Sequence, residues 1–351
     1  MSRPTQNAVE RRKLLARLFP NGIPLLWCPL ITHYDRDGAI DARRMAAHLK
    51  HLSPHVKGLL IPGSTGDGWE LNDADARRLL EIALEQIAGL NLHLLVGVLK
   101  TGTDEAARLM RETADWLQLN RGDDTAENSL IKSRVSGFAV CPPYGKELSQ
   151  EKIGEALASI LRCGLPTALY QLPQITQNEM QPELVAALAR QFPNFILFKD
   201  TSGADHVALA GHKMENVFLV RGAEGDYARW LKAAKGPYDG FLLSTANCFG
   251  LQFHQIIEAL EARRVKAARQ TSERLTACIN EVFGIVTGLP HGNPFANANK
   301  AMDHFFAFGP KAQGATPPRL HAGSHLPGDV IRGTGEALSR HGLMPDKGYL
   351  E

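Results

Sequence analysis

The sequence lacks several features that would assign a protein to a class at once. Its formal net charge is only +2 over 351 residues, which gives no electrostatic case for binding nucleic acid or an acidic membrane surface. The longest apolar runs, residues 22–31 and 241–251, are too short or too interrupted to span a bilayer. The N-terminus is charged and helix-like, without the apolar core or cleavage site of a secretion signal. We therefore expect a cytoplasmic protein with no nucleic-acid or membrane partner.

Cysteine is also scarce. The chain has five cysteines, an odd number, and none of them forms a C-x-x-C pair. Buried thiols in a reducing compartment explain such a pattern best. The five are Cys28, Cys141, Cys163, Cys248 and Cys278.

The chain does contain a regular alternation of short apolar runs and amphipathic segments of helical period. The expected strands are 25–31, 57–61, 92–98, 137–141, 166–170, 195–199, 217–221 and 240–244. The expected helices between them are 42–52, 74–87, 103–119, 150–161, 182–191, 204–214, 226–234 and 252–260. Eight strand–helix units predict an α/β protein, a (β/α)8 TIM barrel. An open doubly wound sheet is the alternative.

Other parts of the chain fall outside this rhythm. Residues 1–21 are expected to form an N-terminal helical extension, and residues 22–262 the barrel. Residues 120–136 are polar and look like a surface insertion. From 263 to 351 we expect extra C-terminal helices, at 264–286, 297–308 and 331–341, with a Pro/Gly-rich loop at 309–328.

Lys199 is the most informative residue. It ends the apolar run 195–199 and is followed by Asp200 and a Thr-Ser-Gly loop. In a barrel, the carboxyl ends of the strands carry the reacting groups. Burial there lowers the pKa of an amine from about 10.4 towards neutrality, as a Schiff-base lysine requires. A lysine paired with Asp200, or one whose head reaches water, would fit this stretch equally well.

Two other motifs follow expected strands. The loop 61–68, Ile-Pro-Gly-Ser-Thr-Gly-Asp-Gly, can hold a carboxylate or phosphate through N–H and O–H donors, although an ordinary Gly-rich turn would look similar. It is neither a P-loop nor a GxGxxG fingerprint. Tyr170 could relay protons or simply pack. It precedes Lys199 by 29 residues, close to the roughly 31 residues of one barrel unit, so the two should end adjacent strands.

With these motifs in place, the chain resembles the dihydrodipicolinate synthase/N-acetylneuraminate lyase family over about residues 22–308. The order and spacing of three motifs carry the resemblance: residues 63–67, 170–176 and 199–203. Shorter matches occur at Gly38–Asp41, Pro142–Tyr144, Gly222–Asp226, Gly240–Asn247 and Asn293–Pro294 before Lys300.

The resemblance implies a Schiff-base-forming aldolase or dehydratase that acts on pyruvate or another 2-oxo acid. It also implies a homo-oligomer, dimer or tetramer, and no cofactor. By resemblance, Lys199 forms the imine and Tyr170 shuttles protons. Ser64 and Thr65, with Gly63, bind the carboxylate beside the keto group, and Leu243 in the eighth-strand motif contributes to the substrate site.

Three positions depart from the family pattern. Asp67 stands in place of the usual glutamate, which is a mild change. Gly145 stands where many members have a second tyrosine, the one that in the synthase relays protons to a neighbouring subunit. Ile175 stands where the synthase has an arginine for a second carboxylate. These departures argue against lysine biosynthesis and for a second substrate portion that is less acidic.

Two alternatives remain open. His48, His51 and His55 have helical spacing and could gather ligands for a metal-dependent, class II-type aldolase. We expect them instead to be solvated on the outside of the barrel. The second alternative is a non-catalytic sensor or accessory protein that binds a 2-oxo acid. The presence of Lys199 together with Tyr170 argues against it, because binding alone needs no imine.

Overall fold

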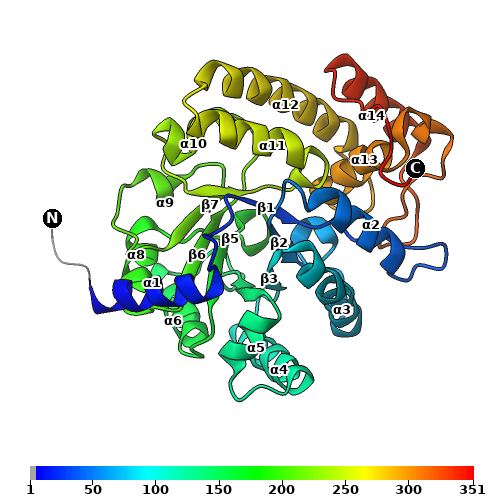
Figure 1. Ribbon diagram of the computed structural model, residues 1–351. Coiled ribbons are helices and arrows are strands. Elements are labelled where there is room, and N and C mark those ends of the chain that lie inside the picture. Colours follow the sequence, from blue (N-terminus) through cyan, green and yellow to red (C-terminus); the bar gives the residue numbers. More distant parts are fainter. Residues whose placement is uncertain (1–4) are drawn as a thin grey trace. The chain divides into compact units, whose positions relative to one another are not determined.

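A closed barrel of eight parallel strands, in the order β1 to β8, organises the chain. The computed structural model describes residues 5–351 (Figure 1). The expected (β/α)8 barrel with extra C-terminal helices is therefore confirmed, and the open sheet was wrong. The strands are β1 Leu26–Pro29, β2 Gly58–Ile61, β3 His93–Val98, β4 Val135–Val140, β5 Thr167–Gln171, β6 Phe195–Asp200, β7 Phe218–Arg221 and β8 Gly240–Leu242.

The chain divides into two compact units, and the first contains residues 5–25, 93–223 and 230–242. Six consecutive strands, β3 to β8, pair in parallel within it. Almost every residue of these strands is buried, as expected when helices cover a parallel sheet. Its helices are α1 Gln6–Leu18, α4 Thr103–Arg121, α5 Ala126–Lys132, α6 Gln150–Leu161, α7 Pro173–Thr176, α8 Pro182–Gln191 and α9 His206–Leu209, with a 3-10 turn at Lys232–Ala234.

The second unit contains residues 26–92, 224–229 and 243–351. It joins the parallel pair β1–β2 to the C-terminal helices. In Figure 1, α11 and α12 run beside one another, and α12 also packs on α13 and α14. Its helices are α2 Ala42–Leu52, α3 Asp73–Leu90, α11 Ala246–Glu261, α12 Val265–Val286, α13 Pro294–Phe308 and α14 Gly328–Arg340, with 3-10 turns at Ser64–Gly66 and Gly309–Gly314. The short α10, Tyr227–Trp230, crosses the boundary between the units.

Side-chain caps explain why several helices begin where the sequence predicts. Asp41 accepts a hydrogen bond from the backbone N–H of Arg44 at 2.9 Å at the start of α2. Ser149 caps α6 through Lys152 in the same way. Such caps satisfy N–H groups that have no partner inside the helix. The predicted bounds of α2, α6 and α8 agree with the structure.

Two helices were predicted too long. Residues 204–214 form only the single turn α9, because Gly211 takes a φ of 69° and ends the pattern. In 226–234 the helix stops at Trp230, because Leu231 turns extended and pairs with Tyr238. The region 120–136, predicted as a polar insertion, contains α5 and the first residues of β4.

No helix within residues 5–351 combines the length and the apolar character that crossing a bilayer would require.

Candidate active site

Lys199 and Tyr170 lie side by side at the ends of neighbouring strands. Lys199 on β6 is in register with Tyr170 on β5, so the prediction of adjacent strand ends is confirmed. The Nζ atom of Lys199 lies 3.8 Å from the centroid of the Tyr170 ring. The two residues are only 4% and 2% exposed. The strand ends therefore hold a buried amine against the face of a phenol ring.

A glycine makes the space that the Lys199 side chain occupies. A Cβ atom on Gly222 would lie 2.9 Å from Lys199 Cε and 2.4 Å from Thr201 Cγ2. Gly222 follows β7 and donates its N–H to the carbonyl of Asp200 at 2.7 Å. Nearby, burial raises the pKa of the Cys141 thiol to about 12, against the opposing effect of the Lys199 charge. The buried thiol therefore stays protonated.

Asp200 belongs to a group of buried charged side chains that also includes Asp205 and Arg221. Successive strand residues point to opposite faces, so Asp200 faces away from Lys199, and it accepts hydrogen bonds from the N–H and Oγ of Ser202 at 2.9 and 2.7 Å. Burial raises its pKa in spite of these bonds. Arg221 holds Asp205 through two bonds of 3.0 Å, and Tyr238 donates to Asp205 at 2.6 Å. This group braces the segment that carries Lys199.

In the second unit, the predicted anion loop forms a 3-10 turn after β2. Thr65 is buried, and Ser64 is half-buried and accepts a hydrogen bond from Trp69 Nε1 at 2.8 Å. The carbonyl of Gly63 is already used by the amides of Gly66 and Gly68, at 2.9 and 3.0 Å. The turn is tight because a Cβ on Gly66 would meet the carbonyl of Leu30 at 2.2 Å.

A buried ion pair closes this loop. Asp67 accepts from Lys300 Nζ at 2.6 Å and from the Tyr34 hydroxyl at 3.0 Å. Lys300 and Asp67 are 1% and 2% exposed. Burial, then the Asp67 carboxylate, raises the pKa of Tyr34, which keeps the phenol protonated as a donor. The sequence argument gave Lys300 no role, although a lysine inside the largely apolar pattern of α13 signals a buried charge with a partner.

The eighth-strand motif contains Leu243 and the residues that bind Glu224. Leu243 is fully buried, donates its N–H to Trp27 at 3.2 Å, and accepts from Ala246 at 3.3 Å. The next residues bind Glu224: Ser244 Oγ at 2.7 Å and Thr245 Oγ1 at 2.8 Å, with the Tyr227 hydroxyl at 2.9 Å. Glu224 lies inside the Gly222–Asp226 match, but only the glycines and Asp226 define that match, so the sequence alone predicted no role for this carboxylate.

The departures from the family pattern have structural counterparts. Gly145 takes a φ of 150°, a region that residues with a Cβ rarely adopt, and a Cβ there would meet Leu148 Cγ at 2.9 Å. A tyrosine would therefore not fit this loop conformation. Tyr144 beside it is 55% exposed, and Ile175 on α7 is 37% exposed. The apolar Ile175 side chain is thus partly exposed to solvent.

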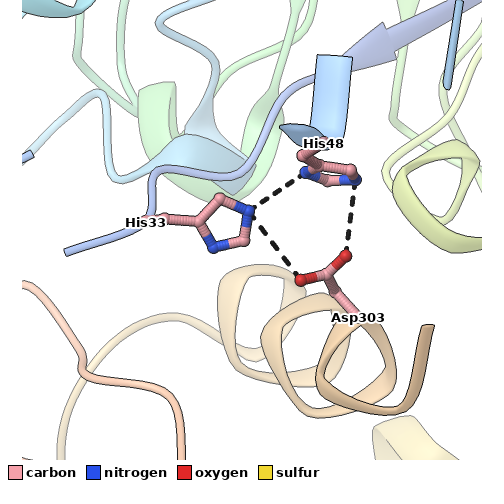
Figure 2. A group of neighbouring side chains, drawn as sticks. All are labelled: His33, His48 and Asp303. Carbon is pink, nitrogen blue, oxygen red and sulfur yellow. Dashed lines mark hydrogen bonds and ion pairs between the residues drawn. The ribbon is translucent and has the colours of Figure 1, made fainter. Parts of the chain in front are cut away.

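His48, His51 and His55 are not the solvated set that the sequence predicted, and His55 lies beyond α2, which ends at Leu52. His48 is fully buried, so that expectation was wrong. Its Nδ1 atom lies 3.1 Å from His33 Nε2, and its Nε2 atom lies 3.5 Å from Asp303 (Figure 2). The same Nε2 atom also lies 2.9 Å from the carbonyl of Asn247. His51 and His55 are half-buried.

His33, His48 and Asp303 have ligand atoms within 4.8 Å of one another, close enough for a metal ion. Their hydrogen bonds favour another role. A carbonyl only accepts, so His48 Nε2 carries a proton and His48 Nδ1 accepts from His33. Asp303 is already bound by Arg44 at 3.1 Å and by the Tyr349 hydroxyl at 3.1 and 3.2 Å. We interpret the cluster as a hydrogen-bonded anchor between α2 and α13.

The comparisons with known proteins agree with the fold and the motifs. A model of the dihydrodipicolinate synthetase family matches residues 125–291. A 4-hydroxy-tetrahydrodipicolinate synthase of Streptococcus uberis is 24% identical over 74% of this chain and 79% of its own length. The solved structure of YagE from E. coli K12, in complex with pyruvate, superposes with a TM-score of 0.70, at 18% identity, over 92% of this chain and 99% of its own.

A second solved structure of similar fold is that of an aldolase. A variant of the 2-keto-3-deoxygluconate aldolase of Sulfolobus solfataricus superposes with a TM-score of 0.69, at 17% identity, over 91% of this chain and 96% of its own. At such identities the solved structures support the fold alone. The family match and the relative's sequence agree with the three ordered motifs, and the chain is similar to the dihydrodipicolinate synthetase family.

Proposed function

We propose that the protein is a Schiff-base-dependent lyase for pyruvate or a pyruvate-derived 2-oxo acid, with Lys199 as the imine-forming residue. The observation that carries this proposal is the buried Lys199 amine, 3.8 Å from the centroid of the Tyr170 ring. The carboxyl end of a barrel strand is where reacting groups lie. Removal from water favours the neutral, nucleophilic form of an amine, which imine formation requires.

The chemistry proceeds through a cation. The Lys199 amine adds to the C2 carbonyl of the substrate, water leaves, and a protonated imine remains. The imine accepts an electron pair when C3 loses a proton, or when the bond from C3 to C4 breaks. The Tyr170 ring face stabilises the positive charge. Its hydroxyl is proposed to carry the proton between the substrate and its leaving portion.

Ser64 and Thr65 are proposed to bind the carboxylate beside the keto group, with the turn at Gly63 shaping their loop. Both are in a 3-10 turn directly after β2, and Ser64 Oγ is held by Trp69. A fixed carboxylate would orient C2 towards the amine, and holding the reacting atoms in this geometry raises the rate of their reaction. Leu243 is proposed to help shape the substrate site through the backbone that follows β8.

The second portion of the substrate is proposed to be less acidic than in 4-hydroxy-tetrahydrodipicolinate synthase, so that the protein is not that synthase. Ile175 supplies no charge for a second carboxylate, and Gly145 supplies no second tyrosine. An apolar or sugar-derived fragment suits an exposed isoleucine better.

We also propose a cytoplasmic homo-oligomer, dimer or tetramer. The five cysteines are all free, as expected in a reducing compartment. Tyr144 and Leu209 expose 55% and 59% of their surface, and such side chains are commonly covered at subunit contacts. Light scattering at working concentration measures the assembly. A monomer would exclude the oligomer.

Borohydride trapping tests the proposed function. The protein is incubated with pyruvate and a panel of longer 2-oxo acids, reduced, digested and analysed by mass spectrometry. We expect the reduced substrate mass on the Lys199 peptide. Lys199→Met should abolish the adduct, whereas Lys152→Met, at an exposed lysine of α6, should leave it unchanged.

The outcomes separate the alternatives. An adduct at Lys199 together with turnover of a panel member supports the lyase. An adduct without turnover of any member would favour a sensor. Modification of Lys300 or another lysine, with Lys199 unmodified, would overturn the assignment. Activity that is lost to a chelator and needs no Lys199 would point to a metal-dependent aldolase.

A further inference from the structure

Helix α13 holds the loop that carries Ser64 and Thr65. Asn293, directly before the helix, donates from Nδ2 to the carbonyl of Ser64 at 3.0 Å. Two turns into the helix, Lys300 reaches Asp67 at the other end of the loop, at 2.6 Å. Residues before and within α13 therefore bind both ends of the loop that follows β2.

The segment after β1 holds the same loop from another side. Thr32 Oγ1 donates to the carbonyl of Gly66 at 2.6 Å, and the Tyr34 hydroxyl donates to Asp67 at 3.0 Å. Asp67 itself takes a left-handed conformation, with a φ of 59°. Residues other than glycine persist in that region when their surroundings fix them. The loop therefore has little freedom to adopt another conformation.

The cluster in Figure 2 fixes the rotation of α13 about its axis. Asp303 lies three residues after Lys300, so the two side chains share one helix face. Asp303 is bound to Arg44, and His33 and His48 stand against it at 3.8 and 3.5 Å. His33 lies between Thr32 and Tyr34 in the chain, the two residues that hold the loop. The buried network thereby keeps Lys300 pointed at Asp67.

We infer that α13 is part of the carboxylate-binding apparatus, with Asn293 and Lys300 as positioning residues for Ser64 and Thr65. This inference rests on the proposed function, because it takes the 2-oxo acid carboxylate as the ligand of the loop. Donors that are fixed before binding cost little to order when the ligand arrives. Loosening them should weaken carboxylate binding and leave the amine chemistry of Lys199 intact.

Asn293→Ser tests this role with little disturbance of the fold. Asn293 also caps α13 by accepting from the N–H of Ala296 at 2.9 Å, and serine caps helices as well as asparagine does. The substitution removes only the donor to Ser64. The matched control is Asn72→Ser, at the N-cap of α3, where Asn72 accepts from Asp75.

In borohydride trapping, Asn293→Ser should raise the half-saturating pyruvate concentration roughly tenfold, as expected for one lost hydrogen bond. The trapping rate at saturation should stay within about twofold. Hydrogen exchange of the Gly66 and Gly68 amides, which bond to Gly63 at 2.9 and 3.0 Å, should become faster. Asn72→Ser should change none of these quantities.

The ion pair offers a second test. Lys300→Met alone leaves a buried carboxylate without its cation, which can prevent folding. The double variant Asp67→Asn/Lys300→Met removes both charges and should fold. It should show the same rise in the half-saturating pyruvate concentration and the same faster hydrogen exchange of the Gly66 and Gly68 amides.

Unchanged half-saturation and unchanged exchange in both variants would overturn the inference. So would a lower saturated rate at unchanged half-saturation, because the residues would then act in the chemistry. If the wild-type protein itself gave no adduct, the proposed function would fail instead. The exchange measurement would still decide whether α13 holds the loop.

Discussion

At the scale of single residues, the hydroxyl of Tyr170 is the group on which the proposed proton transfer depends. Tyr170→Phe keeps the ring over the Lys199 amine, 3.8 Å from its centroid, and removes only the acid–base group. A positioned acid or base contributes roughly 10²–10⁴-fold in rate, so kcat on the true substrate should fall by that order. The measurement is steady-state turnover, with circular dichroism to verify folding.

Imine trapping separates the two functions of this tyrosine. Because Lys199 and the ring face remain, Tyr170→Phe should still yield a borohydride adduct, formed more slowly. Near-normal kcat in Tyr170→Phe would assign the proton transfer to another group, of which Tyr144 and a bound water are the first to test.

The residues that belong to motifs could be found from the sequence, and those that act through distant partners could not. Lys199 and Tyr170 have a spacing that matches one strand–helix unit, and this places them in register. His48 has only helical spacing, which fits a solvated face and a buried one equally well. What decides its burial is Asp303, 255 residues away along the chain, and no local pattern reports such a partner.

At the scale of elements, α1 is fastened by one buried arginine. The Arg11 guanidinium is fully buried and donates to the carbonyls of Phe195 and Phe192, both at 2.6 Å, and to those of Ala189 and Glu215. Burial lowers its pKa to about 10, so it stays charged at neutral pH. Three of these carbonyls come from α8, the segment after it and the start of β6, and that of Glu215 comes from the loop before β7.

Arg11→Met should therefore lower the free energy of unfolding by about 3 kcal/mol, because several buried carbonyls lose a charged donor. Arg12→Met, one residue along the same helix and exposed, should change it by less than about 0.5 kcal/mol. Urea unfolding measures both. Equal stabilities of the two variants would show that α1 is held by its apolar contacts alone.

Helix prediction succeeded where an N-cap, a periodic apolar face and a stop signal coincide. In α2 and α6, the caps Asp41 and Ser149 mark the start. The segments after β6 and β7 carry apolar residues at helical spacing as well. There, Gly211 and the pairing of Leu231 with Tyr238 end the helix early. The second of these is a tertiary contact, which periodicity does not reveal.

At the scale of the whole molecule, buried and half-buried histidines couple stability to pH. His33 is enclosed by His48, Asp303, Arg44 and, further away, Lys300. Burial, followed by the charge of Arg44, holds its pKa well below the ordinary value of 6.5. Burial likewise lowers the pKa values of His51 and His93 to about 4.

The direction in which stability changes with pH depends on how many protons the folded and unfolded states bind. Below about pH 6.5 the unfolded chain protonates these histidines and the folded chain does not, so the unfolded state binds more protons and stability falls as pH falls. His33 alone should contribute a slope of up to about 1.36 kcal/mol per pH unit. We expect the urea midpoint to drop between pH 7 and pH 5.

His33→Gln should flatten this dependence, because its amide can still donate to His48 but does not titrate. The exposed His206 serves as the control, since His206→Gln should leave the slope as it is. Parallel pH curves for His33→Gln and the wild type would show that the acid sensitivity arises elsewhere, with His51 and His93 the next residues to replace.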